Sequence, residues 1–160
     1  MYREREDFIT DWQRSSEGTS AVLRAVTDET LGQSIVEDHN SLGWLGWHLT
    51  TAMSYFSRQL GIQLPALPSM EQPKHASEIA DRYEQYAAHI LELAGQQFDT
   101  AYLREEIDMH GALTTRGQVL RMMVDHQTHH RGQMTVLLRQ AGLPVPGVMG
   151  PTKEESVAKK

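Results

Sequence analysis

No cysteine occurs among the 160 residues, and no long apolar run interrupts the sequence. The first absence excludes disulfides, thiolate metal sites, iron–sulfur clusters and a cysteine nucleophile, so any reacting thiol must come from outside the chain. No stretch approaches the roughly 18 consecutive apolar residues of a membrane span. Residues 1–7 are heavily charged and lack the apolar run of a signal peptide. We therefore expect a cytoplasmic protein that has no membrane partner.

Basic residues are also scarce. The chain has 15 of them against 21 acidic residues, which gives a formal charge of -6. The basic residues are mostly arginines scattered along the chain, and this argues against nucleic acid as a partner. The share of apolar residues, 39%, and of charged residues, 22%, is ordinary for a globular protein. A chain of this length buries a sizeable core without covalent cross-links, so we expect one domain over residues 1–160.

Four segments carry the apolar periodicity of helices, and Gly, Pro, Asp and Asn residues separate them. The predicted helices cover residues 4–26, 41–60, 77–97 and 114–141. Ser41 is a good N-cap residue for the second, and Gly61 and Gly142 follow the ends of the second and fourth. Residues 102–113 give the weakest pattern, and the Pro- and Gly-rich tail at 143–160 should be irregular. With no convincing strand, the fold class is all-α, a four-helix bundle.

Histidines cluster in the middle of the fourth predicted helix, at His126, His129 and His130. Successive helical residues are turned by about 100°, so neighbouring histidines cannot aim at one point. Measured from His126, the apolar stripe is centred between about 20° and 60°, and it includes Val119 and Leu137. His130 lies at about 40°, inside the stripe, whereas His129 lies at about −60°, at its margin. His126 and His130 are therefore the inward pair.

The same construction turns His48 of the second predicted helix towards the core. It shares its side of the helix with five apolar residues, namely Trp44, Leu45, Ala52, Tyr55 and Phe56. A buried imidazole must satisfy two ring nitrogens, and burying it in the charged form is costly. Three inward histidines therefore form either a hydrogen-bonded polar cluster or a site for a divalent metal. Neutral imidazole suits Zn, Ni, Cu and Fe(II).

Several other metal and cofactor motifs are excluded. A His-Glu-x-x-His zinc protease motif needs glutamate after His126, where Gln127 stands. A ferritin-like di-iron centre needs two Glu-x-x-His motifs, and the chain has none. The sequence also contains no Gly-x-Ser-x-Gly elbow, phosphate-binding loop or Rossmann fingerprint.

The chain resembles the DinB-like (damage-inducible) superfamily, which also includes metal-dependent thiol S-transferases. Three motifs carry the resemblance: Gly46-Trp47-His48-Leu49, His126-x-x-x-His130-Arg131-Gly132-Gln133, and the segment at 143–151. The resemblance implies an up-down-down-up four-helix bundle that is commonly a homodimer. It also implies one divalent transition metal, Zn or Ni, bound by His48, His126 and His130.

Three protein ligands leave a coordination position open, as in catalytic metal sites. A metal at such a site makes bound water or a bound thiol more acidic. The first hypothesis, implied by the resemblance, is a thiol S-transferase-like detoxification or stress enzyme that joins a low-molecular-weight thiol to a small-molecule substrate. The alternatives are a hydrolase that uses hydroxide and a non-catalytic metal-binding stress protein. A vestigial site should be sealed by side chains such as Trp44, Tyr55 or Met122.

Four further residues are candidates for supporting the metal or the substrate: His129, Arg131, Gln133 and Tyr55. Arg131 either binds carboxylates of the thiol or forms a structural ion pair. His129 either acts as a base near the metal or lies on the surface. Trp44 is expected in the core or at a dimer interface, and Met122 in the core. No catalytic residue is assigned.

Overall fold

The computed structural model describes residues 1–158, and it is mostly helical. The long helices are α1 (Arg5–Arg24), α2 (Leu42–Gln59), α3 (Ala76–Gln97) and α5 (Arg116–Gln140). A 3-10 turn η1 (Asp28–Thr30), two short helices α4 (Thr100–Arg104) and α6 (Lys153–Ala158), and two strands β1 (Glu106–Met109) and β2 (Ala112–Thr115) complete the described elements. No helix among the described residues is both long enough and apolar enough to cross a membrane.

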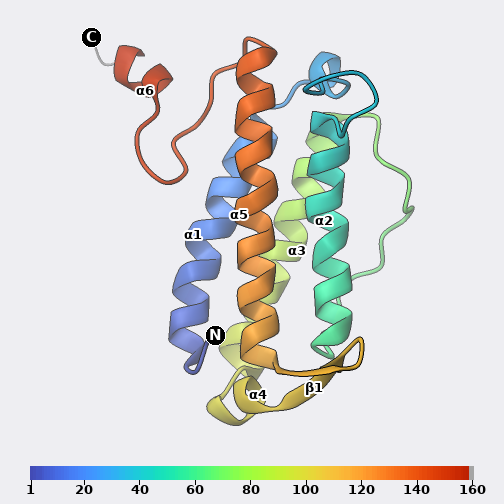
Figure 1. The fold of residues 1–160 in the computed structure, drawn as a ribbon, viewed down its shortest axis with the longest axis vertical. Coiled ribbons are helices and arrows are strands. Elements are labelled where there is room, and N and C mark those ends of the chain that lie inside the picture. Colours follow the sequence, from blue (N-terminus) through green and yellow to red (C-terminus); the bar gives the residue numbers. More distant parts are fainter. Residues whose placement is uncertain (159–160) are drawn as a thin grey trace.

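The four long helices form a bundle in which α1 and α5 run in one direction and α2 and α3 in the other (Figure 1). Helices α1 and α2 each pack against both α3 and α5. The core between them is built on large, fully buried side chains, including Phe8, Trp12, Tyr83, Tyr86 and Phe98. This arrangement brings α2 beside α5, so the histidines of the two helices are neighbours.

Local signals in the sequence explain where the two histidine-bearing helices begin and end. The Ser41 hydroxyl accepts a hydrogen bond from Trp44 N at 3.2 Å and caps α2. Thr115 and Gln118 form a capping box at the start of α5. Gly61 and Gly142 follow the two helices with φ angles of 70° and 72°, a conformation that glycine adopts freely. The predicted boundaries at 41–60 and 114–141 therefore lie within two residues of the observed helices.

Two short elements differ from the sequence prediction. Strands β1 and β2 form an antiparallel hairpin whose two-residue loop, His110 and Gly111, has positive φ angles of 58° and 86°. Four-residue strands are too short for a clear alternating pattern, so residues 102–113 gave no convincing strand. The tail at 143–160 is also not wholly irregular, because α6 forms in it. Thr152 caps this helix, and Glu154 pairs with Arg139 of α5 at 2.8 Å.

Candidate metal centre

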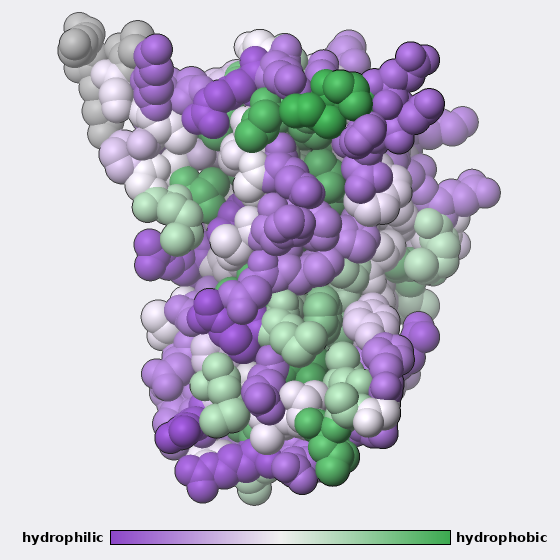
Figure 2. Space-filling model, in the orientation of Figure 1, coloured by the Kyte–Doolittle hydropathy of each residue, from purple (hydrophilic) through white to green (hydrophobic). Residues whose placement is uncertain are grey.

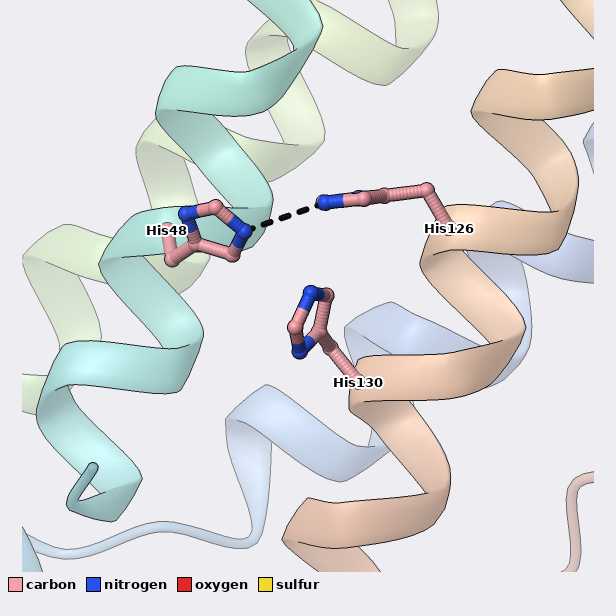
Figure 3. A group of neighbouring side chains, drawn as sticks. All are labelled: His48, His126 and His130. Carbon is pink, nitrogen blue, oxygen red and sulfur yellow. Dashed lines mark hydrogen bonds between the residues drawn. The ribbon is translucent and has the colours of Figure 1, made fainter. Parts of the chain in front are cut away.

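Three histidines from two helices face one another across the gap between α2 and α5 (Figure 3). They are His48 of α2 and His126 and His130 of α5, and all three are partly buried. Each has one ring nitrogen in a group whose members all lie within 4.8 Å of one another. The Nε2 atoms of His48 and His126 are 3.0 Å apart and share a hydrogen bond. The three imidazoles predicted to point inward therefore do converge.

The backbones of the helices set this convergence. His126 and His130 are one turn apart on α5, and their ring centroids are 4.5 Å apart. On α2, Gly46 lies against the core, where an added Cβ atom would be 2.9 Å from the Leu23 side chain and 3.2 Å from Ile79. The glycine therefore lets α2 pack closely two residues before His48.

Two aromatic side chains flank the histidine rings. Trp44 stacks on His48 with ring centroids 4.8 Å apart and an interplanar angle of 12°. Phe56 packs against His126 in a T-shaped arrangement, with ring centroids 5.6 Å apart. Trp44 is 41% exposed, so it lies outside the core and covers the outer side of His48. The alternative that it lies at a dimer interface stays a prediction. Met122, predicted in the core, is 49% exposed.

The surroundings of His48 and His126 favour their neutral forms. Burial, with smaller contributions from the neighbouring His130, His48 and His129, lowers the pKa of His126 to about 4. Burial also lowers the pKa of His48, with a smaller contribution from His130. Metal ions bind the neutral ring, so these environments favour the binding form near neutral pH.

Gln133 orients the third ring. Its Oε1 atom lies 2.8 Å from His130 Nδ1, so this nitrogen donates the hydrogen bond and carries the proton. The Nε2 lone pair of His130 is then free for a metal, as in sites where a supporting residue fixes the histidine tautomer. Gln133 was one of the predicted supporting residues, and the structure places it against a histidine of the cluster.

The donor set fits a transition metal. Tetrahedral Zn with Zn–N bonds of about 2.0–2.1 Å separates its ligand nitrogens by roughly 3.3 Å. The 3.0 Å spacing between His48 and His126 is within a few tenths of an ångström of that value. The cluster contains imidazoles and no carboxylate, which suits Zn or Ni and not Mg or Ca. The Nδ1 atom of His126 is buried without a hydrogen-bond partner among the described residues, so its ring depends on Nε2 for polar contacts.

The remaining predicted residues lie outside the group of three nitrogens. His129 is exposed, and its ring centroid is 4.8 Å from that of His130. Tyr55 is 39% exposed, and its hydroxyl lies 2.6 Å from Nε2 of His110 at the tip of the hairpin. Tyr55 was expected on the inward side of its helix, and it is instead exposed and in contact with the hairpin.

Arg131 connects α5 to α1. It is only 4% exposed, and its Nη1 atom donates to Ser15 O at 2.7 Å, Ser15 Oγ at 3.2 Å and Thr19 Oγ1 at 3.1 Å. All three acceptors are neutral, so these contacts are hydrogen bonds and not the ion pair that we considered. Burial lowers the pKa of the guanidinium. Arg131 therefore contacts α1, whereas His126 and His130 face His48 of α2.

One buried polar residue next to the cluster was not predicted from the sequence. Gln127 is fully buried directly after His126, where it accepts a hydrogen bond from the Tyr83 hydroxyl at 3.0 Å and donates to Leu49 O at 3.5 Å. It thereby ties α5 to α3 and to α2 next to the histidines. Gln127 lies about 100° around the helix from His126, close to the margin of the apolar stripe. The helical positions used for His126 and His130 could therefore have indicated that Gln127 is buried.

The bundle and the three-histidine cluster define the class of protein, an all-α bundle with a candidate metal site between two of its helices. The family model described as "DinB family" matches residues 1–160. The chain is 37% identical to YrdA of Bacillus subtilis over 157 residues, which cover 97% of this chain and 93% of YrdA. The chain therefore belongs to the DinB family.

Solved structures show the same fold. The crystal structure of a DinB-like protein from Bacillus cereus ATCC 10987 matches with a TM-score of 0.87 and 36% identity, and the match covers 92% of this chain and 99% of that one. The DinB-like protein YjoA of Bacillus subtilis matches with a TM-score of 0.69 over 91% of this chain and 99% of its own. At 16% identity, YjoA supports the fold alone.

Proposed function

We propose that this protein is a metal-dependent enzyme of the thiol S-transferase type, in which His48, His126 and His130 hold one Zn or Ni ion. The observation that carries the proposal is the convergence of three imidazole nitrogens within 4.8 Å, with no carboxylate among them. Three neutral ligands leave the full charge of the cation uncompensated and a coordination position open. Such a cation lowers the pKa of a bound thiol.

The reaction joins an external thiol to a small electrophile. The sulfur forms a bond to an electrophilic carbon, the leaving group departs with the bonding electrons, and the thiol proton passes to solvent. The chain contains no cysteine, so the thiol is a low-molecular-weight cosubstrate. In this scheme Gln133 holds His130 in the tautomer that binds the metal, and Trp44 and Phe56 fix the rings of His48 and His126.

A hydrolase that uses hydroxide is the less favoured alternative. It needs a general base near the metal, and the acidic residue nearest in sequence is Asp125. Its carboxylate is held in an ion pair with Arg121 at 2.7 Å, with more than half of its side chain exposed. The cluster therefore lacks the carboxylate that this reaction requires.

A non-catalytic metal-binding stress protein is the second alternative. A fully sealed site would favour it. Trp44 covers one side of His48, but all three histidines are only partly buried. This partial exposure supports an enzyme. A cytoplasmic location, a role in stress response or detoxification, and assembly as a homodimer complete the proposal.

The proposal is tested with protein loaded separately with Zn and with Ni. Thiol consumption is followed for a panel of low-molecular-weight thiols with small epoxide and alkyl halide electrophiles. We expect metal-dependent product formation that His130→Ala abolishes and His129→Ala preserves. Hydrolysis of the same electrophiles without thiol consumption would instead favour the hydrolase, and inactivity of the loaded protein with every pair would favour the non-catalytic protein.

A further inference from the structure

An apolar cavity lies one helical turn from the histidine cluster. Its volume is about 310 Å³, and it opens between the loop that precedes α2 and the second half of α5. Seven residues line it, namely Ile35, His39, Asn40, Leu45, Gln133, Val136 and Leu137. Figure 2 shows the corresponding apolar surface near the upper ends of α2 and α5, with polar surface below it.

The cavity has a buried floor and exposed apolar walls. Leu45 and Leu137 are almost fully buried, at 2% and 3% exposure, and they belong to the protein core. Ile35 and Val136 are 50% and 47% exposed, so two large aliphatic side chains from different elements face solvent around one opening. Apolar side chains grouped around a concave surface mark a binding site more often than scattered ones do.

Both helices connect the cavity to the histidine cluster. Leu45 precedes His48 by three residues on α2, so the two share one face of that helix. On α5, Gln133 lines the cavity and also bonds to Nδ1 of His130. A single side chain, Gln133, therefore contacts a candidate metal ligand and forms part of the cavity wall.

The chemical character of the lining residues indicates which kind of ligand the cavity would bind. The lining includes no carboxylate, lysine or arginine, and the polar groups present are the imidazole of His39 and the amides of Asn40 and Gln133. Such a surface favours uncharged aliphatic groups. The volume is at the lower end of the range of about 300–1,000 Å³ that is usual for ligand sites, so it suits a short substituent.

We propose that this cavity receives the aliphatic substituent of the substrate that reacts at the histidine cluster. The substrate class is then a small electrophile with a short, uncharged aliphatic chain. The proposal rests on the proposed function, because it places the reacting end of the substrate at the metal. It adds a specificity determinant, Val136, on the wall of the cavity.

Straight-chain hydroxamic acids test the proposal by direct binding, because their head group binds Zn and their alkyl chain varies in length. The Zn-loaded protein is titrated by calorimetry with acids of two to eight carbons. We expect the affinity to rise with each added methylene until the cavity is full, by up to about fourfold per methylene, the change that corresponds to about 0.8 kcal/mol. Longer chains should then add nothing.

Val136→Asp places a carboxylate in the wall and should abolish the gain with chain length, and the milder Val136→Ala should reduce it. Val36→Asp is the matched control, because Val36 is 56% exposed in the same loop as Ile35 but does not line the cavity. It should keep the full gain. Acetohydroxamic acid should bind all three variants as it binds the wild type.

Three results would overturn the assignment. Tight acetohydroxamate binding with no dependence on chain length would refute the cavity while leaving the metal site intact. Failure of the Zn-loaded protein to bind any hydroxamate would refute the proposed function and the cavity assignment with it. The third result combines two observations: the wild type shows no chain-length effect, and Val136→Asp sediments as a smaller species than the wild type. It would assign the cavity to an interface between copies of the chain.

Discussion

Replacement of Arg131 separates a structural role from a role in substrate binding. Its guanidinium donates three hydrogen bonds to Ser15 and Thr19 of α1 from a position that is 4% exposed. Hydrogen bonds to charged groups contribute about 1.5–3 kcal/mol each, but these three share one nitrogen and do not add. Removal of a buried charge offsets part of the loss. We expect Arg131→Ala to lower the free energy of unfolding by about 3 kcal/mol, and Arg131→Met by about half of that, because Met refills the volume of the aliphatic stem.

Urea denaturation in the presence of a chelator measures this effect without a contribution from metal binding. For a chain of this length, a loss of about 3 kcal/mol corresponds to a decrease in Tm of roughly 6–12 °C. Arg121→Met is the control, because Arg121 forms an exposed ion pair with Asp125 and should change stability by less than about 0.5 kcal/mol. Unchanged stability of Arg131→Met together with weakened thiol binding would refute the structural role and assign Arg131 to the substrate.

Two further predictions concern a close backbone contact and a pH-dependent pair. Gly117→Ala should lower the free energy of unfolding by about 1–3 kcal/mol in urea, because the new Cβ atom would fall on the carbonyl oxygen of Tyr2. Gly132→Ala, whose Cβ atom would meet no described atom within 4 Å, should instead increase stability by about 0.5–1 kcal/mol. His75 Nδ1 donates a hydrogen bond to the Asp28 carboxylate, 2.8 Å away, and this contact raises the pKa of His75 and lowers the pKa of Asp28. The pair therefore stabilises the fold between the two pKa values, and its contribution is lost as pH rises through the folded pKa of His75 or falls through that of Asp28. In Asp28→Asn, NMR titration should show the His75 pKa falling towards about 6.5, and an unchanged value would refute the contact.

The sequence predicts the bundle and the inward histidines well, because helical periodicity is a local property that four long segments express clearly. The predicted pair at His126 and His130 and the inward side of His48 agree with the observed cluster. The angular argument is less accurate at the edges of the apolar stripe. It placed Met122 in the core, although the packing of α5 exposes Met122 and buries Met123.

Helical periodicity does not predict contacts between segments that are distant in the sequence. Nothing in the spacing of Tyr55 indicates that a hairpin places His110 beside it. The acceptors of Arg131 lie 112 and 116 residues away, on a helix whose position depends on the whole bundle. The cavity beside the cluster likewise forms between the loop before α2 and α5, and it exists only once these segments pack together.

Metal content tests the central claim most directly. Protein purified without an affinity tag is loaded with Zn or Ni, desalted and analysed for bound metal, with His130→Ala and His129→Ala alongside. We predict one equivalent per chain in the wild type and in His129→Ala, whose ring lies outside the cluster, and a loss of that equivalent in His130→Ala. Absence of stoichiometric metal in the wild type, or equal content in all three proteins, would contradict the assignment of His48, His126 and His130 as a metal site.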